Sequence, residues 1–168
     1  MDAEQPSKGS VKTGDRAPDF SLPDQNGQTV SLRDLVSKKI VVLYFYPADF
    51  SRGCTAEACS FRDSYEVFKE AGAEVVGVSS QSVDSHRRFA AENTLPFILL
   101  SDQNGEVRKL YGVSSTLGLI PGRVTFIIDK KGIVRHVFSS QLNPTKHVEE
   151  ALQVLKEISS EPTDVKEG

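Results

Sequence analysis

The chain has 168 residues, a formal net charge of -3 and two cysteines, and this length suffices for one domain whose core needs no crosslinks. Two cysteines are too few for the disulfide framework of a small secreted protein or for a structural metal site with its usual four ligands. The mixed charges form no sustained basic face, so neither nucleic acid nor an anionic membrane is an expected partner. We therefore expect a reducing compartment, and small molecules or proteins as partners.

The two ends of the chain are polar and poor in aromatic and branched side chains. We expect a flexible N-terminal segment over residues 1–10 and a flexible C-terminal tail over residues 158–168, which leaves one domain over residues 11–157. No apolar run approaches the roughly 18 residues of a membrane-spanning helix, and the N-terminus resembles neither a signal peptide nor a transit peptide. The prediction is a cytoplasmic protein, with an organelle such as the plastid as the alternative if a targeting segment has been removed.

The first half of the domain begins with a predicted hairpin, because residues 20–22 and 29–32 flank the turn sequence DQNG. A short helix follows it. Residues 40–46 (IVVLYFY) form a continuous β-branched and aromatic run, which is typical of a strand buried on both faces. Pro47 then ends this strand, since proline cannot donate to the ladder of a central strand.

Helices and strands alternate through the rest of the domain. The pattern predicts helices over 55–70 and 84–93, and strands over 74–79 and 97–100. A hairpin over 124–138 and a final helix from residue 144 or 145 to about 156 complete the order. Parallel strands followed by an antiparallel pair indicate an α/β chain with a thioredoxin-like fold, in which helices flank a mixed central sheet and a β-hairpin extends the N-terminus.

Cys54 lies just after the strand over 40–46, where active sites of such sheets are found. Helix-forming residues follow it, so its sulfur should face the open N-terminus of a helix. Backbone N–H groups and the helix macrodipole stabilise an anion at that position. The thiolate is the reactive form of cysteine, and the sequence therefore predicts a reactive thiol at Cys54.

Cys59 follows Cys54 by five positions, and this spacing constrains how the two thiols can react. On an intact helix the two Cα atoms lie roughly 8.7 Å apart. A disulfide tolerates a Cα separation of at most about 7 Å. The pair is therefore predicted to be a mobile redox couple that closes only when at least one helical turn unwinds.

The residues around this pair resemble a known family. Pro47, Ser51 and Cys54 spell P-x-x-x-S-x-x-C, which is similar to the peroxiredoxin signature. Cys59, in CTAEAC, resembles the bacterioferritin comigratory protein or peroxiredoxin Q branch, and Arg123, in PGR before a strand, resembles the remote arginine of that family. The resemblance covers about residues 11–156.

The resemblance implies an atypical 2-Cys, thioredoxin-dependent peroxiredoxin. Cys54 would be the peroxidatic cysteine, which attacks hydrogen peroxide or a small organic hydroperoxide to give a sulfenic acid, and Cys59 the resolving cysteine that condenses with it. Pro47 would shield the pocket, Ser51 would hydrogen-bond the peroxide, and Arg123 would stand beside the thiolate. Thioredoxin or a similar dithiol would reduce the disulfide, no haem, flavin or metal is expected, and the branch favours a monomer.

Arg52 departs from the branch, which usually has proline before the glycine of its PGCT motif. A nearby cation favours the thiolate of Cys54. The loss of a fixed φ would also let the start of the helix unwind more readily. Both effects are hypotheses that an Arg52→Pro variant tests.

Other interpretations remain open at this point. Cys59 could be a core thiol on an apolar helix face, Ser51 could serve only as a helix cap, and Arg123 could be an ordinary surface arginine. Glu57 is interpreted as a first-turn capping carboxylate and is left out of the catalytic residues. The three histidines show no metal-ligand spacing and are interpreted as solvated or satisfied side chains.

Two alternative functions also remain. One is a protein-directed dithiol oxidoreductase or peroxide sensor, and the other is a non-catalytic binding module with a thioredoxin fold. A disulfide oxidoreductase would normally carry C-x-x-C, whereas C-x-x-x-x-C demands unwinding and suits a peroxide-triggered cycle. A binding module should tolerate loss of the Cys54 thiol.

Overall fold

The computed structural model of the protein describes residues 11–113, 115–116, 120–121, 123–139 and 145–159. In these residues the chain forms helices and strands in the order β1 (Ser21–Pro23), β2 (Thr29–Ser31), α1 (Leu32–Val36), β3 (Ile40–Phe45), α2 (Arg52–Asp63), α3 (Tyr65–Glu70), β4 (Ala73–Ser79), α4 (Val83–Asn93), β5 (Ile98–Ser101), α5 (Glu106–Leu110), β6 (Ser115–Thr116), β7 (Ile120–Pro121), β8 (Val124–Ile128), β9 (Val134–Ser139) and α6 (Lys146–Ser159).

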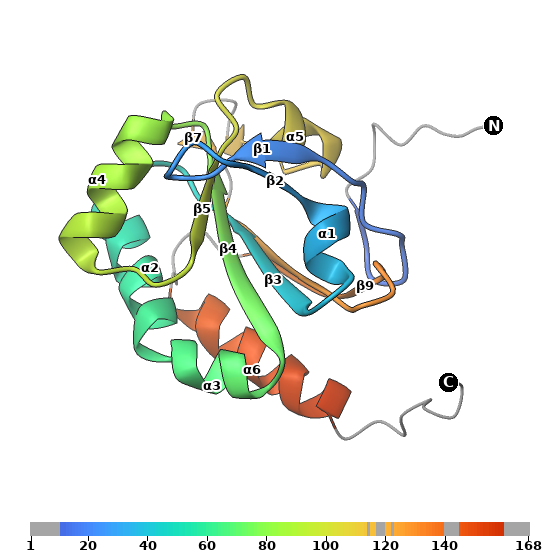
Figure 1. Ribbon diagram of the computed structural model, residues 1–168. Helices are drawn as coiled ribbons and strands as arrows, with labels where there is room; N and C mark the ends of the chain where they lie inside the picture. Colours follow the sequence, from blue (N-terminus) through green and yellow to red (C-terminus); the bar gives the residue numbers. More distant parts are fainter. Residues whose placement is uncertain (1–10, 114, 117–119, 122, 140–144, 160–168) are drawn as a thin grey trace.

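A five-stranded sheet in the order β5-β4-β3-β8-β9 forms the centre of the fold (Figure 1). β3 pairs in parallel with β4, and β4 with β5, whereas β8 is antiparallel to both β3 and β9. The predicted mixed sheet and thioredoxin-like α/β architecture are therefore confirmed. β3 occupies the middle because its continuous apolar run can be buried on both faces.

Two apolar layers cover the sheet. Val42 and Tyr44 of β3 contribute to a cluster with residues of α2, α3, α4 and α6. Val41, Leu43 and Phe45 point to the opposite face, where α1, α5 and residues near the first hairpin cover them (Figure 1). The alternation of side chains along one strand thus holds both helical layers in place.

Both predicted hairpins are present. β1 and β2 pair antiparallel across the DQNG turn, where the Asp24 carboxylate accepts hydrogen bonds from the backbone N–H groups of Asn26 and Gln28. β8 and β9 form the second hairpin, in which the Asp129 carboxylate accepts from the backbone N–H groups of Lys131 and Ile133. Short aspartate side chains stabilise such turns by bonding their own backbone.

The single helix predicted over residues 55–70 is wrong in two respects. The helix begins earlier, at Arg52, because Ser51 caps it, and it breaks at Ser64 into α2 and α3. Ser64 has φ -105° and ψ 7°, and its N–H is shared between the carbonyls of Ser60 and Phe61. Both helices contribute buried residues to the same face of the sheet, including Phe61 of α2 and Phe68 of α3.

The sequence predicts no helix or strand between residues 100 and 124, whereas the structure places α5, β6 and β7 there. α6 also extends to Ser159, so the first two residues of the predicted tail are helical. The predictions for residues 1–10 and for the rest of the tail lie outside the described residues, and the domain boundaries stay predictions. No helix among the described residues is long and apolar enough to cross a membrane.

Candidate active site

Cys54 occupies the first turn of α2, at the carboxyl end of the central strand. Tyr46 extends the pairing of β3 by one residue through its N–H bond to the carbonyl of Val78, at 3.0 Å. Pro47 follows it and is half-buried. Ser51 is the N-cap of α2, and its Oγ accepts the Cys54 N–H at 3.3 Å. The cap fixes the start of the helix directly before the thiol.

Arg123 lies beside the Cys54 thiol although 69 residues separate them in the chain. β8 is antiparallel to β3, with Val124 opposite Phe45, so the residue before Val124 lies at the end of β3 where the Cys54 segment begins. The guanidinium Nη1 donates to Cys54 Sγ at 3.4 Å, and both side chains are buried. A cation at this distance stabilises the thiolate in a site from which water is largely excluded.

Glu57 belongs to the same cluster, and the interpretation of it as a capping carboxylate is wrong, because Ser51 caps the helix. Its side chain is fully buried, and its Oε1 accepts from Arg123 Nη1 at 2.7 Å. Its Oε2 has no hydrogen-bond partner among the described residues and lies 3.7 Å from His147 Nδ1. Burial raises the pKa of Glu57 to about 8, against the opposing pull of Arg123.

The charged groups of this cluster also change the pKa values of Arg123 and of the nearby Tyr44. Burial acts to lower the pKa of Arg123, but Glu57 and Cys54 outweigh burial and raise it, so the guanidinium stays charged. Burial raises the pKa of Tyr44 well above its usual value, and the nearby Glu57 and Cys54 add to the effect. The Tyr44 ring stacks on Phe61 of α2 with the ring centroids 4.6 Å apart, and both rings belong to the buried cluster that includes Cys54.

Cys59 lies on the same intact helix but outside the Arg123 cluster. It is half-buried, and its Sγ donates to Asn93 Oδ1 of α4 at 3.6 Å. Both thiols are free. Because α2 is continuous from Arg52 to Asp63, the helical spacing of roughly 8.7 Å between the two Cα atoms applies, and a disulfide requires unwinding.

The structure brings together three of the five predicted site residues, namely Cys54, Ser51 and Arg123. Pro47 stands at the entrance to the same loop, and Cys59 is held away from Cys54. One of the alternatives is excluded, because Arg123 is only 6% exposed and is no surface arginine. Ser51 does cap the helix, and its bond to the peroxide stays a prediction. The Ser51 hydroxyl also donates to the carbonyl of Ala48 at 3.1 Å.

A polarised, buried thiol at a helix N-terminus, beside a guanidinium and with a second thiol in reach after unwinding, is suited to peroxide reduction. A family model described as the AhpC/TSA family matches residues 13–137, which is most of the chain. The chain belongs to this family of peroxiredoxins. It is therefore a thiol-based peroxidase, and its two cysteines fit the atypical 2-Cys class.

Two relatives indicate the branch of the family to which the chain is similar. Peroxiredoxin Q, chloroplastic, of Triticum aestivum is 50% identical over 151 residues, which cover 89% of this chain and 69% of that protein. The protein of the same name from Sedum lineare is 52% identical over 149 residues, 88% of this chain and 80% of that protein. The predicted resemblance to the peroxiredoxin Q branch is thus confirmed.

Solved structures agree with this assignment. Peroxidoxin BcpB from Mycobacterium tuberculosis superposes with a TM-score of 0.82 at 42% identity, covering 88% of this chain and 98% of that one. A bacterioferritin comigratory protein of Xanthomonas campestris, whose structure is described together with alkyl peroxide reduction activity, has a TM-score of 0.77 at 28% identity and covers 84% of this chain and 92% of that one.

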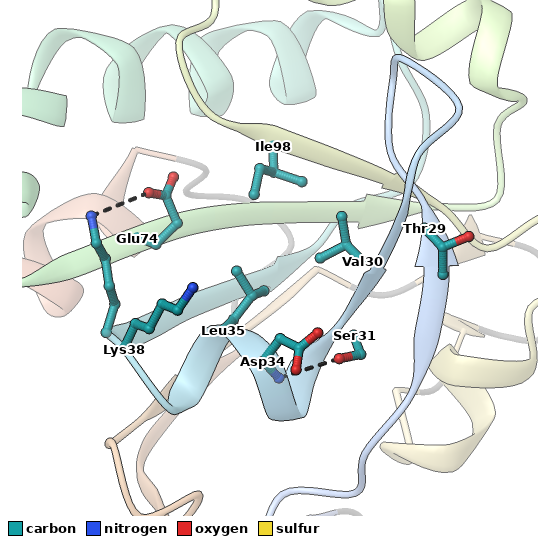
Figure 2. A pocket seen from close by; sticks show the side chains of 9 residues that line it. Thr29, Val30, Ser31, Asp34, Leu35, Lys38, Glu74 and Ile98 are labelled. Carbon is teal, nitrogen blue, oxygen red and sulfur yellow. Dashed lines mark hydrogen bonds and ion pairs between the residues drawn. The ribbon is translucent and has the colours of Figure 1, made fainter.

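The other end of the sheet carries a surface pocket of about 290 Å³, shown in Figure 2. Lys38 and Glu74 line it near the amino ends of β3 and β4, whereas Cys54 follows the carboxyl end of β3. The pocket of this peroxiredoxin therefore lies at the opposite end of β3 from the reactive thiol. Among the described residues, no group of three or more His, Cys, Asp or Glu side chains could hold a metal ion.

Proposed function

We propose that this peroxiredoxin reduces hydrogen peroxide and small organic hydroperoxides through a Cys54 sulfenic acid and a Cys54–Cys59 disulfide. The observation that carries the proposal is the 3.4 Å contact between Arg123 Nη1 and Cys54 Sγ at the N-terminus of α2. The guanidinium and the helix N-terminus together favour the thiolate, which is the nucleophile.

In the first step, the Cys54 thiolate forms a bond to the terminal peroxide oxygen while the O–O bond breaks. The sulfur is oxidised to a sulfenic acid, and the departing oxygen takes a proton and leaves as water or an alcohol. Arg123 can stabilise the charge that moves onto the departing oxygen. Ser51 can turn its hydroxyl from the Ala48 carbonyl to the peroxide, and Pro47 shields the pocket in which the peroxide binds.

In the second step, the first turns of α2 unwind and the Cys59 thiolate attacks the sulfenic sulfur. A disulfide forms and water leaves. A dithiol reductant, which we propose to be thioredoxin or a similar protein, then exchanges with the disulfide and restores both thiols. The contact of Cys59 with Asn93 must break before this resolution can occur.

The reaction of reduced protein with one equivalent of hydrogen peroxide tests these roles, with thiol titre and intact mass followed over time. The wild type should lose two thiols and about two mass units, Cys59→Ser should accumulate a trapped sulfenic acid, and Cys54→Ser should stay inert. A sulfenic acid on Cys59, or an equally reactive Cys54→Ser variant, would contradict the assignment. A protein-directed oxidoreductase would instead oxidise slowly with peroxide and rapidly with a partner disulfide.

We further propose a plastid location and a monomeric state. The chloroplastic relatives support the location over the cytoplasm. The monomer is inferred from the resemblance to the peroxiredoxin Q branch alone. Light scattering during gel filtration of the reduced and oxidised protein would test the second point, because a stable dimer would elute at twice the mass of about 18.4 kDa.

A further inference from the structure

A buried polar cluster supports the loop that leads into α2, and its member Asp49 lies two residues before Ser51, the N-cap of that helix. Asp49 takes part in three hydrogen bonds: it accepts from Tyr46 Oη at 2.6 Å and from Ser85 Oγ at 2.8 Å, and its Oδ2 shares a hydrogen with His86 Nδ1 at 2.7 Å. The side chains of Asp49 and His86 are completely buried. Neither of them contacts Cys54, and the mechanism above does not use them.

The cluster connects three separate segments of the chain. His86 Nε2 lies 2.9 Å from the carbonyl oxygen of Leu100 at the end of β5. A carbonyl can only accept, so Nε2 carries a hydrogen, and Nδ1 shares the remaining proton with Asp49 Oδ2. The pair therefore ties the loop after β3 to α4 and β5 with every polar atom satisfied. A fully satisfied buried network rigidifies the segments that it joins.

The loop held in this way contains a strained residue. Phe50 has φ +67°, in the left-handed region that residues with a side chain rarely adopt. Its ring packs edge-on against Phe89 at 5.2 Å, and the Arg88 guanidinium lies 5.8 Å from the ring centroid. α4 therefore holds this turn at two points. Its Phe89 and Arg88 contact Phe50, and its Ser85 and His86 bond the Asp49 carboxylate. Such strain persists only where the surroundings fix the backbone.

The strained turn sets the position of the thiol. Ser51 comes directly after Phe50; its hydroxyl oxygen accepts from the Cys54 N–H, and its O–H donates to the Ala48 carbonyl. The path of the backbone at residues 49–51 therefore determines where the first turn of α2 starts, and with it where the sulfur lies relative to Arg123. A displacement of the order of 1 Å at a reacting atom can lower a rate about 100-fold.

We propose that Asp49 and His86 are positioning residues, which lock the Phe50–Ser51 turn and thereby hold the Cys54 thiol in line for a peroxide. The proposal deepens the proposed function and depends on the role of Cys54 in it. A buried polar pair of this kind is weak evidence for stability alone, since apolar residues of the same volume often stabilise as well. The place of the Asp49–His86 pair, next to the strained Phe50 and close in the chain to the reactive thiol, instead indicates a role in positioning Cys54.

The test compares two reactions of the same thiol in a Cys59→Ser background, which isolates the first step. One is oxidation of Cys54 by hydrogen peroxide, which needs an oriented attack, and the other is alkylation by iodoacetamide, which reports the thiolate. Asp49→Ala should lower the oxidation rate about 10- to 100-fold and the alkylation rate far less. Asp49→Asn should restore oxidation to within about threefold, because its amide can donate to His86 Nδ1 while its oxygen accepts from Tyr46.

Two further variants keep the test decisive. Glu92→Ala removes an exposed acidic side chain of α4, the helix that carries His86, and it should react as the parent does. Ser85→Ala removes one of the three bonds to Asp49 at little cost to folding, and it should lower the ratio of oxidation to alkylation about two- to fivefold even if Asp49→Ala does not fold. A thermal melt of each variant establishes that it is folded.

The outcomes separate this proposal from the proposed function. If the Cys59→Ser parent reacts with peroxide no faster than free cysteine, the proposed function fails. If the parent reacts rapidly and the Asp49 and Ser85 variants do the same, only the positioning role is overturned. An equal fall of oxidation and alkylation would also overturn it, because such a fall shows a general loss of thiolate or of structure.

Discussion

Glu57→Gln is expected to stabilise the folded protein at alkaline pH but not at acidic pH. The carboxyl is fully buried and burial raises its pKa from 4.5 to about 8. A folded-state pKa above the unfolded value means that the stabilisation is complete below about pH 4.5 and is lost as the pH rises through about 8. The glutamine is a good mimic of the protonated acid, because its oxygen can still accept from Arg123.

The magnitude follows from the size of the shift. One pKa unit corresponds to about 1.4 kcal/mol, so ionising Glu57 inside the fold costs up to about 5 kcal/mol of the free energy of unfolding. We expect the variant and the parent to be nearly equal at about pH 5, and the variant to be more stable by at least about 2 kcal/mol at about pH 8.

Urea denaturation of both proteins across this pH range measures the difference directly. A Cys54→Ser background removes the titration of the thiol, and Glu70→Gln, at an exposed position of α3, provides a matched control whose effect should not change with pH. A difference that stays flat, or a parent that gains on the Glu57→Gln variant as the pH rises, would refute the reasoning. Either result would show that the attraction of Arg123 outweighs the cost of burying the carboxylate.

Three further changes test separate parts of the site. In a Glu57→Gln background, Arg123→Met should slow Cys54 oxidation about 10- to 150-fold in stopped-flow assays, because a charged hydrogen bond is worth about 1.5–3 kcal/mol. An unchanged rate would remove Arg123 from the mechanism. Arg52→Pro should slow disulfide formation about two- to fivefold, since proline favours the first helical position, and equal loss rates for the second thiol would reject that effect. Asn93→Ala should speed disulfide formation about twofold by releasing Cys59, and a slower reaction would contradict this role.

The central strand and the place of Cys54 could be predicted from local sequence alone. The apolar run of β3 has no polar face, and Pro47 marks its end, so the thiol had to follow the carboxyl end of a buried strand. The contact of Arg123 with Cys54 could be expected only from the family resemblance. Its physical basis is the antiparallel register of β8 with β3, which no local pattern reveals.

Glu57 was missed although the sequence carries a signal for it. Cys54, Glu57, Ala58 and Phe61 recur at the spacing of one helix face, and all four are buried. A glutamate within such an apolar stripe indicates a buried charge that needs a partner. The usual preference of acidic residues for the first turn of a helix suggested a surface role instead.

The Asp49–His86 pair could not be found from the sequence, because 37 residues separate its members and neither belongs to a recognisable pattern. The interpretation of His86 as a satisfied side chain is confirmed, but its partners depend on how α4 packs against the loop. The break at Ser64 has the same origin. Both features are consequences of tertiary packing, which local periodicity does not encode.

The rate at which reduced protein reacts with hydrogen peroxide, compared with free cysteine at the same pH, tests the central claim most directly. The helix N-terminus, Arg123 and the held loop predict that Cys54 reacts at least about 100-fold faster than free cysteine. A rate close to that of free cysteine would contradict the account, because it would show that the contacts around Cys54 do not activate the thiol toward a peroxide.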